Sequence, residues 1–213
     1  LPAAIYNAKQ QLLEPIDALS NLSVNVVKNE MKGVPGETGI AAQKYYVIET
    51  PYQQLVFTNI GGALAEINLP YESKEDKESV VKEIEFDRLM VQNHPYNAHF
   101  PSHAYMTPPE DKGAPVEHKE GVLGGYYPLI RRNLIQGDPR KSVIIQPSYY
   151  ATNIVSEHPE TANLVYEVKT FTKDTIVFEA QQGHRRITKT YSVASESQAP
   201  YAIDLTIDVE GAS

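Results

Sequence analysis

The chain has 213 residues, a formal net charge of −8, 41% hydrophobic residues and no cysteine. This composition is that of a globular protein, and no run of about 18 consecutive apolar residues predicts a membrane span. The acidic balance argues against nucleic-acid binding, which needs a concentrated basic face, and the missing cysteines exclude disulfides, thiolate zinc sites and cysteine nucleophiles. Because the chain opens at Leu1 instead of Met and stops at Ser213, we expect a piece of a longer protein, which leaves open a membrane anchor elsewhere in that protein.

The first 40 residues predict a short helical segment followed by a loop. Apolar residues recur at spacings of three and four from Ala3 to Leu22, which is typical of amphipathic helices. Residues 32–39 are rich in glycine and proline and predict a loop. The helical segment either packs on the domain or links it to an upstream part. We expect the β-rich domain to occupy residues 41–213.

From Tyr45 the hydrophobic period changes to two, which is typical of strands. Strands are predicted at Tyr45–Ile48, Gln54–Ile60 and Ala63–Leu69. Gly61 and Gly62 separate the last two, and a two-residue hairpin turn needs positive φ at both central positions. In the third strand, Ala65 and Ile67 are expected on one face and Glu66 on the other.

Residues 72–87 form an acidic segment, with seven acidic residues and three lysines. A net charge of −4 over this length is typical of a solvated loop or face. Val80, Val81, Ile84 and Leu89 fit a short helix, but Ile84 to Phe86 also alternate as in a strand. The sequence leaves this element open.

Residues 93–128 contain six prolines and four histidines and predict an irregular Pro/His-rich insertion. It is expected to be either an elaborated surface loop or an insertion with local structure of its own.

Regular alternation then returns to the end of the chain. Extended segments are predicted at Ser142–Gln146, Asn163–Phe171, Thr175–Ala180, Arg185–Val193 and Tyr201–Val209. The last alternates apolar and polar residues throughout, which indicates an antiparallel sheet with one buried and one wet face. Successive strands, tight turns and few helices predict a mostly β fold, an antiparallel β-sandwich.

The histidines are the first candidates for chemistry. His94, His99 and His103 lie close in sequence, but Pro101 interrupts any helix that would bring the last two together as a zinc pair. His184 follows Glu179 across a predicted turn, and such a pair can serve as acid and base in a sugar-ring-opening enzyme. Cross-strand charge pairs are also common surface features, so a structural role is favoured for both.

Other motifs are equally weak. Residues 121–125 are glycine-rich but lack a phosphate-binding pattern, and Ser148, Ser156 and Ser192 lack a nucleophile context. The fourteen tyrosines either line a carbohydrate or peptide groove or stand at sandwich rims. The sequence therefore predicts no catalytic residue, no metal ligand and no cofactor, and it identifies no partner-binding residue.

Two blocks carry a family resemblance. The first runs from Tyr46 to Ile67, contains Gly61 and Gly62, and is followed by Leu69-Pro70-Tyr71. It resembles the opening of the large periplasmic domain in the YidC family of bacterial membrane-protein insertases. The second block, Arg186–Val193 followed by Tyr201–Val209, is similar to a strand pair of the same domain.

The resemblance implies a β-supersandwich akin to sugar mutarotases, on the periplasmic side of the bacterial inner membrane. The implied role is non-catalytic: a scaffold or docking surface for Sec translocon subunits or for emerging membrane proteins. The family's insertion chemistry belongs to a transmembrane core that this chain lacks, so no insertase residue can be carried over. The family's domain continues past the second block, so we expect this chain to hold its first part.

Two other readings remain open. A carbohydrate-binding or mutarotase/epimerase-like enzyme would need a cleft with converging His and acidic side chains, for which His184 and Glu179 are the candidates. A general interaction or chaperone-like domain of the cell envelope is the other.

Overall fold

The structure is a computed structural model that describes residues 43–74, 77–110, 113–131, 133–135, 142–193 and 199–211. All belong to one compact unit, Gln43–Ser213. The predicted helical segment and loop of residues 1–40 lie outside the described residues. Among the helices described, none is long and apolar enough to cross a bilayer.

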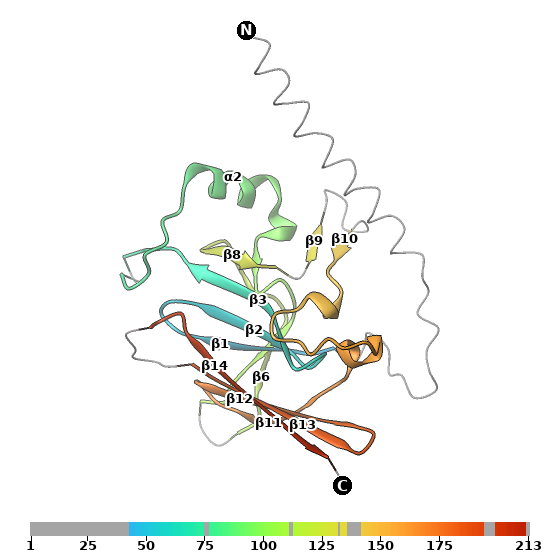
Figure 1. The fold of residues 1–213 in the computed structure, drawn as a ribbon. Coiled ribbons are helices and arrows are strands. Elements are labelled where there is room, and N and C mark those ends of the chain that lie inside the picture. Colours follow the sequence, from blue (N-terminus) through green and yellow to red (C-terminus); the bar gives the residue numbers. More distant parts are fainter. Residues whose placement is uncertain are drawn as a thin grey trace. The chain divides into compact units, whose positions relative to one another are not determined.

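Strands are the main regular structure of the described chain (Figure 1). The strands are β1 (Tyr45–Glu49), β2 (Gln54–Thr58), β3 (Ala63–Pro70), β4 (His99–Phe100), β5 (Tyr105–Thr107), β6 (Val116–His118), β7 (Val122–Leu123), β8 (Tyr126–Ile130), β9 (Asn133–Ile135), β10 (Ser142–Ile144), β11 (Glu167–Phe171), β12 (Thr175–Gln182), β13 (Arg185–Val193) and β14 (Ile203–Gly211). The helices are α2 (Glu85–Asn93) and the 3₁₀ turns η2 (Pro95–Asn97), η3 (Pro147–Tyr149) and η4 (Pro159–Asn163).

Two main sheets organise the fold. One has the strand order β6-β5-β1-β2-β3-β8, and the other has the order β11-β12-β13-β14. Their strand pairs are antiparallel except for β1 with β5, where Tyr46 lies opposite Met106. Two small sheets, β4-β7 and β9-β10, complete the described strands.

The main core lies between the two sheets. Tyr46, Ile48 and Phe57 from the six-stranded sheet share one buried cluster with Phe178 and Tyr191 from the four-stranded sheet. Burial of this shared apolar surface is what holds the two sheets face to face. The prediction of a mostly β, antiparallel sandwich is therefore confirmed.

The predicted hairpin is confirmed, but one facing prediction is wrong. Gly61 and Gly62 have φ of 73° and 51° between β2 and β3, as the turn requires. A bulge between Val56 and Phe57 puts two residues of β3 opposite one step of β2. As a result Ala65 packs on the outer side of the sheet, although Ile67 packs against the main core.

The six-stranded sheet is buried on its second face as well. Tyr45, Val47, Val56 and Ala65 form a second cluster there, and Tyr105 packs against it. Residues 93–128 supply η2, β4, β5, β6 and β7 together with the start of β8. Of these, β5, β6 and β8 are strands of the main sheet, so this proline-rich stretch is part of the sandwich.

One strand prediction needs correction, and one element that the sequence left open is settled. The strand expected from Asn163 begins only at Glu167, because residues 159–163 form η4 and Val165 makes only an isolated bridge to Ile60. The residues near Leu89 that fitted either a helix or a strand are helical, in α2.

Candidate docking surface

Helix α2 lies with its apolar stripe turned outward. Phe86, Leu89 and Met90, spaced by three and four residues, share one face and are 64%, 44% and 37% exposed. The half-buried positions are Asp87 and Val91, one turn apart on another face. Val91 lies against Gly124, whose added Cβ would stand 3.6 Å from a Val91 methyl carbon. The helix is therefore attached by a narrow edge, while its apolar side chains face solvent.

Local interactions explain why these residues are helical without burial. The backbone N–H of Ile84 donates to the Asp87 carboxylate over 3.0 Å, which caps the first turn. Glu85 and Asp87 place negative charge at the positive end of the helix dipole. The N–H of His94 donates to the Met90 carbonyl and closes the last turn. These interactions stabilise both ends of the helix without involving its apolar face.

Two further exposed apolar residues, Val80 and Ile84, precede the helix. We define the α2 surface as Val80, Ile84, Phe86, Leu89 and Met90, all classed among the exposed large apolar residues. In Figure 1, α2 lies beside β8, at the end of the unit remote from the four-stranded sheet. Exposed large apolar side chains gathered on one helix and the residues before it indicate an interaction site.

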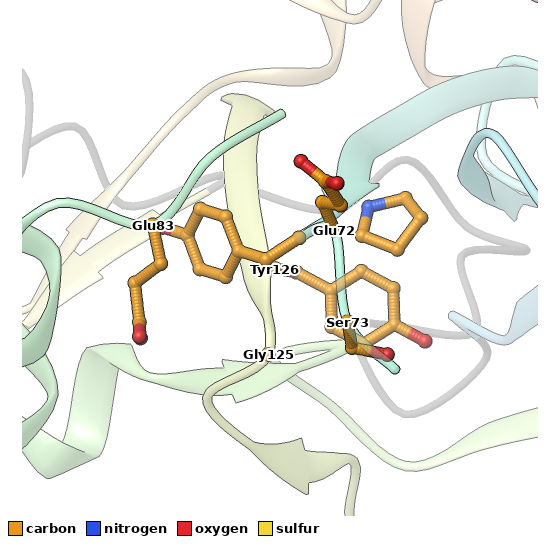
Figure 2. A pocket seen from close by; sticks show the side chains of 7 residues that line it. Glu72, Ser73, Glu83, Gly125 and Tyr126 are labelled. Atoms are coloured by element: carbon orange, nitrogen blue, oxygen red, sulfur yellow. The ribbon is translucent and has the colours of Figure 1, made fainter. Parts of the chain in front are cut away.

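An open pocket of about 430 Å³ adjoins the start of α2. It lies where the end of β3 meets the start of β8, and it is lined by Pro70, Tyr71, Glu72, Ser73, Glu83, Gly125 and Tyr126. Figure 2 shows Glu72 and Glu83 on either side of Tyr126. Backbone hydrogen bonds fix its walls, from Tyr71 N to the Gly125 carbonyl at 3.0 Å and from Glu72 N to the Val81 carbonyl at 2.7 Å.

The pocket has an acidic and aromatic character. Burial, and then the Asp87 and Glu83 carboxylates, raise the pKa of Tyr71, so its hydroxyl stays neutral. The Tyr126 hydroxyl donates to the Glu49 carboxylate over 2.9 Å, which anchors its ring. Carboxylates beside aromatic rings form an environment that favours a cationic group. The acidic segment was the sequence signal for this place, but it did not reveal the pocket or the apolar stripe.

The structure does not bring the clustered histidines together. His99 Nδ1 lies 3.1 Å from the Gly121 carbonyl and 3.2 Å from a Glu120 carboxylate oxygen. The His103 ring stacks on Tyr45, with 5.2 Å between ring centroids. Within the described part of the chain, no group of three or more His, Asp or Glu residues has the spacing of a metal site. These rings have packing and hydrogen-bonding roles.

His184 and Glu179 are separated as well. The antiparallel register of β12 and β13 pairs Glu179 with Thr188. The Glu179 carboxylate instead lies 3.4 Å from the Lys169 ammonium on β11. An acid and base acting on one substrate would have to converge, and this arrangement gives Glu179 a different partner.

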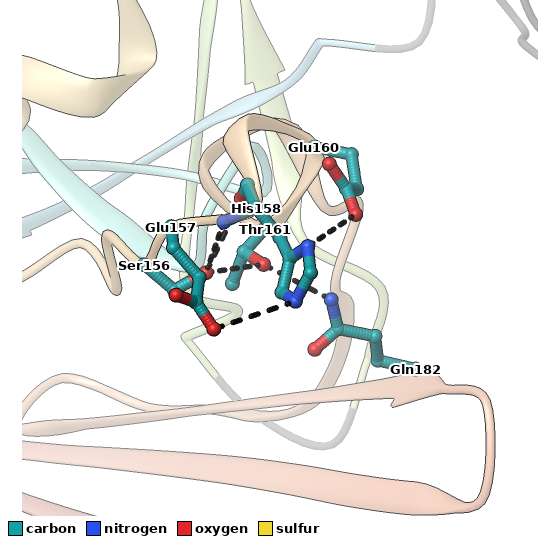
Figure 3. Close-up of polar contacts among 6 residues, drawn as sticks. All are labelled: Ser156, Glu157, His158, Glu160, Thr161 and Gln182. Carbon is teal, nitrogen blue, oxygen red and sulfur yellow. Dashed lines mark hydrogen bonds and ion pairs between the residues drawn. The ribbon is translucent and has the colours of Figure 1, made fainter.

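A polar cluster around Ser156 serves to tie a loop to β12 (Figure 3). Ser156 Oγ accepts the His158 N–H at 3.1 Å and lies 3.1 Å from Thr161 Oγ1. Gln182 on β12 donates to the same Thr161 oxygen over 3.1 Å. The His158 ring faces Glu157 and Glu160 at 3.9 and 3.7 Å, so it is not aimed at Ser156 as a catalytic base.

The other motifs also resolve into structural roles. Gly124 and Gly125 have φ of 72° and 85°, so the glycine-rich stretch forms the turn between β7 and β8. The tyrosines fit neither predicted alternative as a group, since several of them lie in the core. A group of them is buried, namely Tyr45, Tyr46, Tyr150, Tyr166 and Tyr191. Only Tyr71 and Tyr126 line the pocket described above.

Comparison with known proteins identifies relatives along nearly the whole chain. No family model matches, and no solved structure matches significantly. A protein of Chlamydia caviae is 33% identical over 215 residues, which cover 100% of this chain and 25% of that protein. Proteins of Chlamydia muridarum and Chlamydia trachomatis are 32% and 34% identical, and each match covers 97% of this chain and 24% of the relative.

These relatives are membrane-protein insertases. Each is named membrane protein insertase YidC, so the resemblance to the YidC family is confirmed, and it extends along the whole chain. The chain spans about a quarter of the length of these curated relatives.

Proposed function

We propose that this chain is a non-catalytic periplasmic domain that assists the insertion and folding of inner-membrane proteins as a docking surface. The observation that carries the proposal is the outward apolar stripe of α2, in a chain that matches insertases along its whole length. Docking needs an accessible apolar patch, whereas catalysis needs converging reactive groups. The enzymatic alternative loses its candidate pair, because Glu179 is engaged by Lys169.

The partners in this proposal are Sec translocon subunits or emerging membrane proteins. The parent protein is anchored in the bacterial inner membrane, and this part of it faces the periplasm. The name of the relatives supports the membrane setting and the insertion role.

The test uses the full-length parent protein in cells depleted of their own insertase. The variant Leu89→Gln/Met90→Gln changes two exposed side chains of the α2 surface, and Val116→Gln changes an exposed side chain on β6 as the matched control. We expect the α2 variant to reduce protease-protected insertion of a reporter membrane protein, and a photo-crosslinker at Phe86 to capture a Sec subunit or the reporter. Full insertion together with an unchanged crosslinking pattern in the α2 variant would refute the proposal.

A further inference from the structure

We infer that the α2 surface binds a positively charged amphipathic segment of a partner protein, with a Lys or Arg side chain of that segment in the adjoining pocket. The inference rests on the proposed docking function and adds the chemistry of the partner. It is argued from the apolar stripe and from the charges around it.

The apolar stripe is bordered by negative charge. In the described parts of the acidic segment, residues 72–74 and 77–87, five acidic residues outnumber three lysines. Glu72 lies 3.9 Å from Lys82 and Glu83 lies 4.0 Å from Arg88, and such long, solvent-exposed ion pairs leave both carboxylates open to a partner's cation. A partner that covers the stripe must therefore present apolar side chains flanked by positive ones.

The pocket gives one cationic side chain a defined place. Glu72 and Glu83 supply negative charge at its walls, and Tyr71 and Tyr126 supply aromatic rings. A Lys ammonium or Arg guanidinium over such a ring gains a cation–π attraction in addition to the charge pairing. A volume of about 430 Å³ accommodates a long basic side chain.

The same charges disfavour two other occupants of the α2 surface, an anionic membrane and a second copy of the chain. An anionic bilayer surface attracts basic segments and repels an acidic patch. A second copy of the chain docked through the same face would place one acidic border against another, because a two-fold contact is self-complementary. A basic partner segment is the occupant that matches both the stripe and its border.

The experiment measures binding of three labelled synthetic helical peptides to the full chain by fluorescence anisotropy. The peptides share one leucine face and differ on the other face, which carries lysine, glutamine or glutamate. Protein variants are Leu89→Gln/Met90→Gln for the stripe, Glu72→Gln/Glu83→Gln for the pocket, and Val116→Gln and Glu117→Lys on β6 as matched controls. Circular dichroism and unfolding midpoints show whether each variant folds as the parent chain does.

We expect saturable binding of the lysine peptide that weakens with salt, and at least about tenfold weaker binding of the glutamate peptide. The stripe and pocket variants should each weaken the lysine peptide by about tenfold, and the β6 variants should not change it. Equal binding of the three peptides, preferential binding to anionic lipid vesicles, or dimerisation through α2 would overturn the inference. If the pocket variant has no effect while Leu89→Gln/Met90→Gln still impairs insertion in cells, the partner chemistry fails and the docking function stands.

Discussion

The Lys189 ammonium on β13 donates a hydrogen bond to the carbonyl oxygen of Gly61, 2.8 Å away and 128 residues earlier in the chain. Lys189 is fully buried, and its nitrogen also donates to the Thr152 carbonyl at 2.8 Å and lies 5.5 Å from the centre of the Tyr166 ring. Such a lysine is stable inside a protein only when its donors are satisfied. Here the carbonyl oxygens of the turn and of a loop accept hydrogen bonds from two of its three donors, and the Tyr166 ring lies close to the charge.

Tyr191, two residues further along β13, makes a similar contact with the other glycine of the turn. Its hydroxyl donates to the Gly62 carbonyl over 2.7 Å and lies 2.7 Å from Thr152 Oγ1. Gly61 and Gly62 belong to the first block that carries the family resemblance, and Lys189 and Tyr191 belong to the second. The two blocks are therefore contact partners that join the two sheets.

Replacement of Tyr191 by Phe tests this contact. The change keeps the buried ring but leaves the Gly62 carbonyl without that donor, which should lower the free energy of unfolding by about 1–2 kcal/mol. Tyr201→Phe is the control, since Tyr201 is 41% exposed, and it should change stability by less than about 0.5 kcal/mol. Urea denaturation of both variants measures the difference, and equal midpoints would show that the hydroxyl contributes nothing.

Because Lys189 is buried, we expect the free energy of unfolding to rise with pH above neutrality. Burial lowers the pKa of Lys189 to about 8 from the ordinary 10.5, so the unfolded chain binds the proton more tightly than the folded one. Stability then increases as pH rises from the folded toward the unfolded pKa, by about 1 kcal/mol between roughly pH 7 and pH 9. The neutral amine keeps two N–H donors for the two carbonyls.

At still higher pH the trend reverses. Burial raises the pKa of Tyr166 and Tyr191 to about 12, so the unfolded chain loses these protons near pH 10 while the folded chain retains them. We expect a stability maximum between about pH 9 and pH 10. Lys189→Met should abolish the rise between pH 7 and pH 9, whereas Lys169→Met, at an exposed lysine, should keep it. A flat profile in the parent chain would contradict the assignment.

Alanine substitutions at Gly61 and Gly183 would distinguish the cost of backbone strain from the cost of steric overlap. Both have positive φ, 73° and 60°, so alanine at either position costs about 1 kcal/mol of strain. A Cβ at Gly61 would also lie 2.4 Å from the Asn153 Oδ1 atom, whereas a Cβ at Gly183 meets nothing within 4 Å. Gly61→Ala should therefore destabilise the chain by about 2 kcal/mol more than Gly183→Ala. Equal losses in thermal denaturation would mean that Asn153 moves aside freely.

The sequence predicted the parts of the fold that depend on local patterns. Alternation from Tyr201 to Val209 and the glycines at residues 61–62 gave β14 and the hairpin, because strand period and turn geometry are local properties. The bulge at Val56 was not visible, since it depends on how two strands register against each other. Lys189 shows the same limit, because its burial depends on carbonyl oxygens far away in sequence.

The outward orientation of the α2 surface could not be predicted from the sequence, for a different reason. The spacing of Phe86, Leu89 and Met90 is that of a helix face, and such a face is normally the buried one. The sequence gives no sign that Asp87 and Val91 form the inner edge instead. That orientation follows from the tertiary position of Gly124 beside Val91.

A last prediction concerns Glu66, which is 1% exposed on the outer side of the six-stranded sheet. Its carboxylate accepts hydrogen bonds from the Ser102 backbone N–H at 3.2 Å and from the Ser102 hydroxyl, and from Asn68 at 3.4 Å. Its charge also opposes the lowering that burial imposes on the pKa of Arg131. The carboxylate thus ties Ser102 to β3, and its negative charge offsets part of the cost of burying the Arg131 guanidinium.

Glu66→Gln keeps the shape of the side chain but removes its charge. We expect the free energy of unfolding to fall by about 1–3 kcal/mol, because Arg131 loses its compensating charge and the bonds from Ser102 weaken. Amide hydrogen exchange should accelerate first around Ser102, since the weakened contact is the one that fixes this segment to β3. Glu117→Gln, at an exposed position of β6, should change neither quantity. If exchange near Ser102 stays as slow as in the parent chain, the apolar cluster of Tyr45 and Val56 alone holds the segment in place.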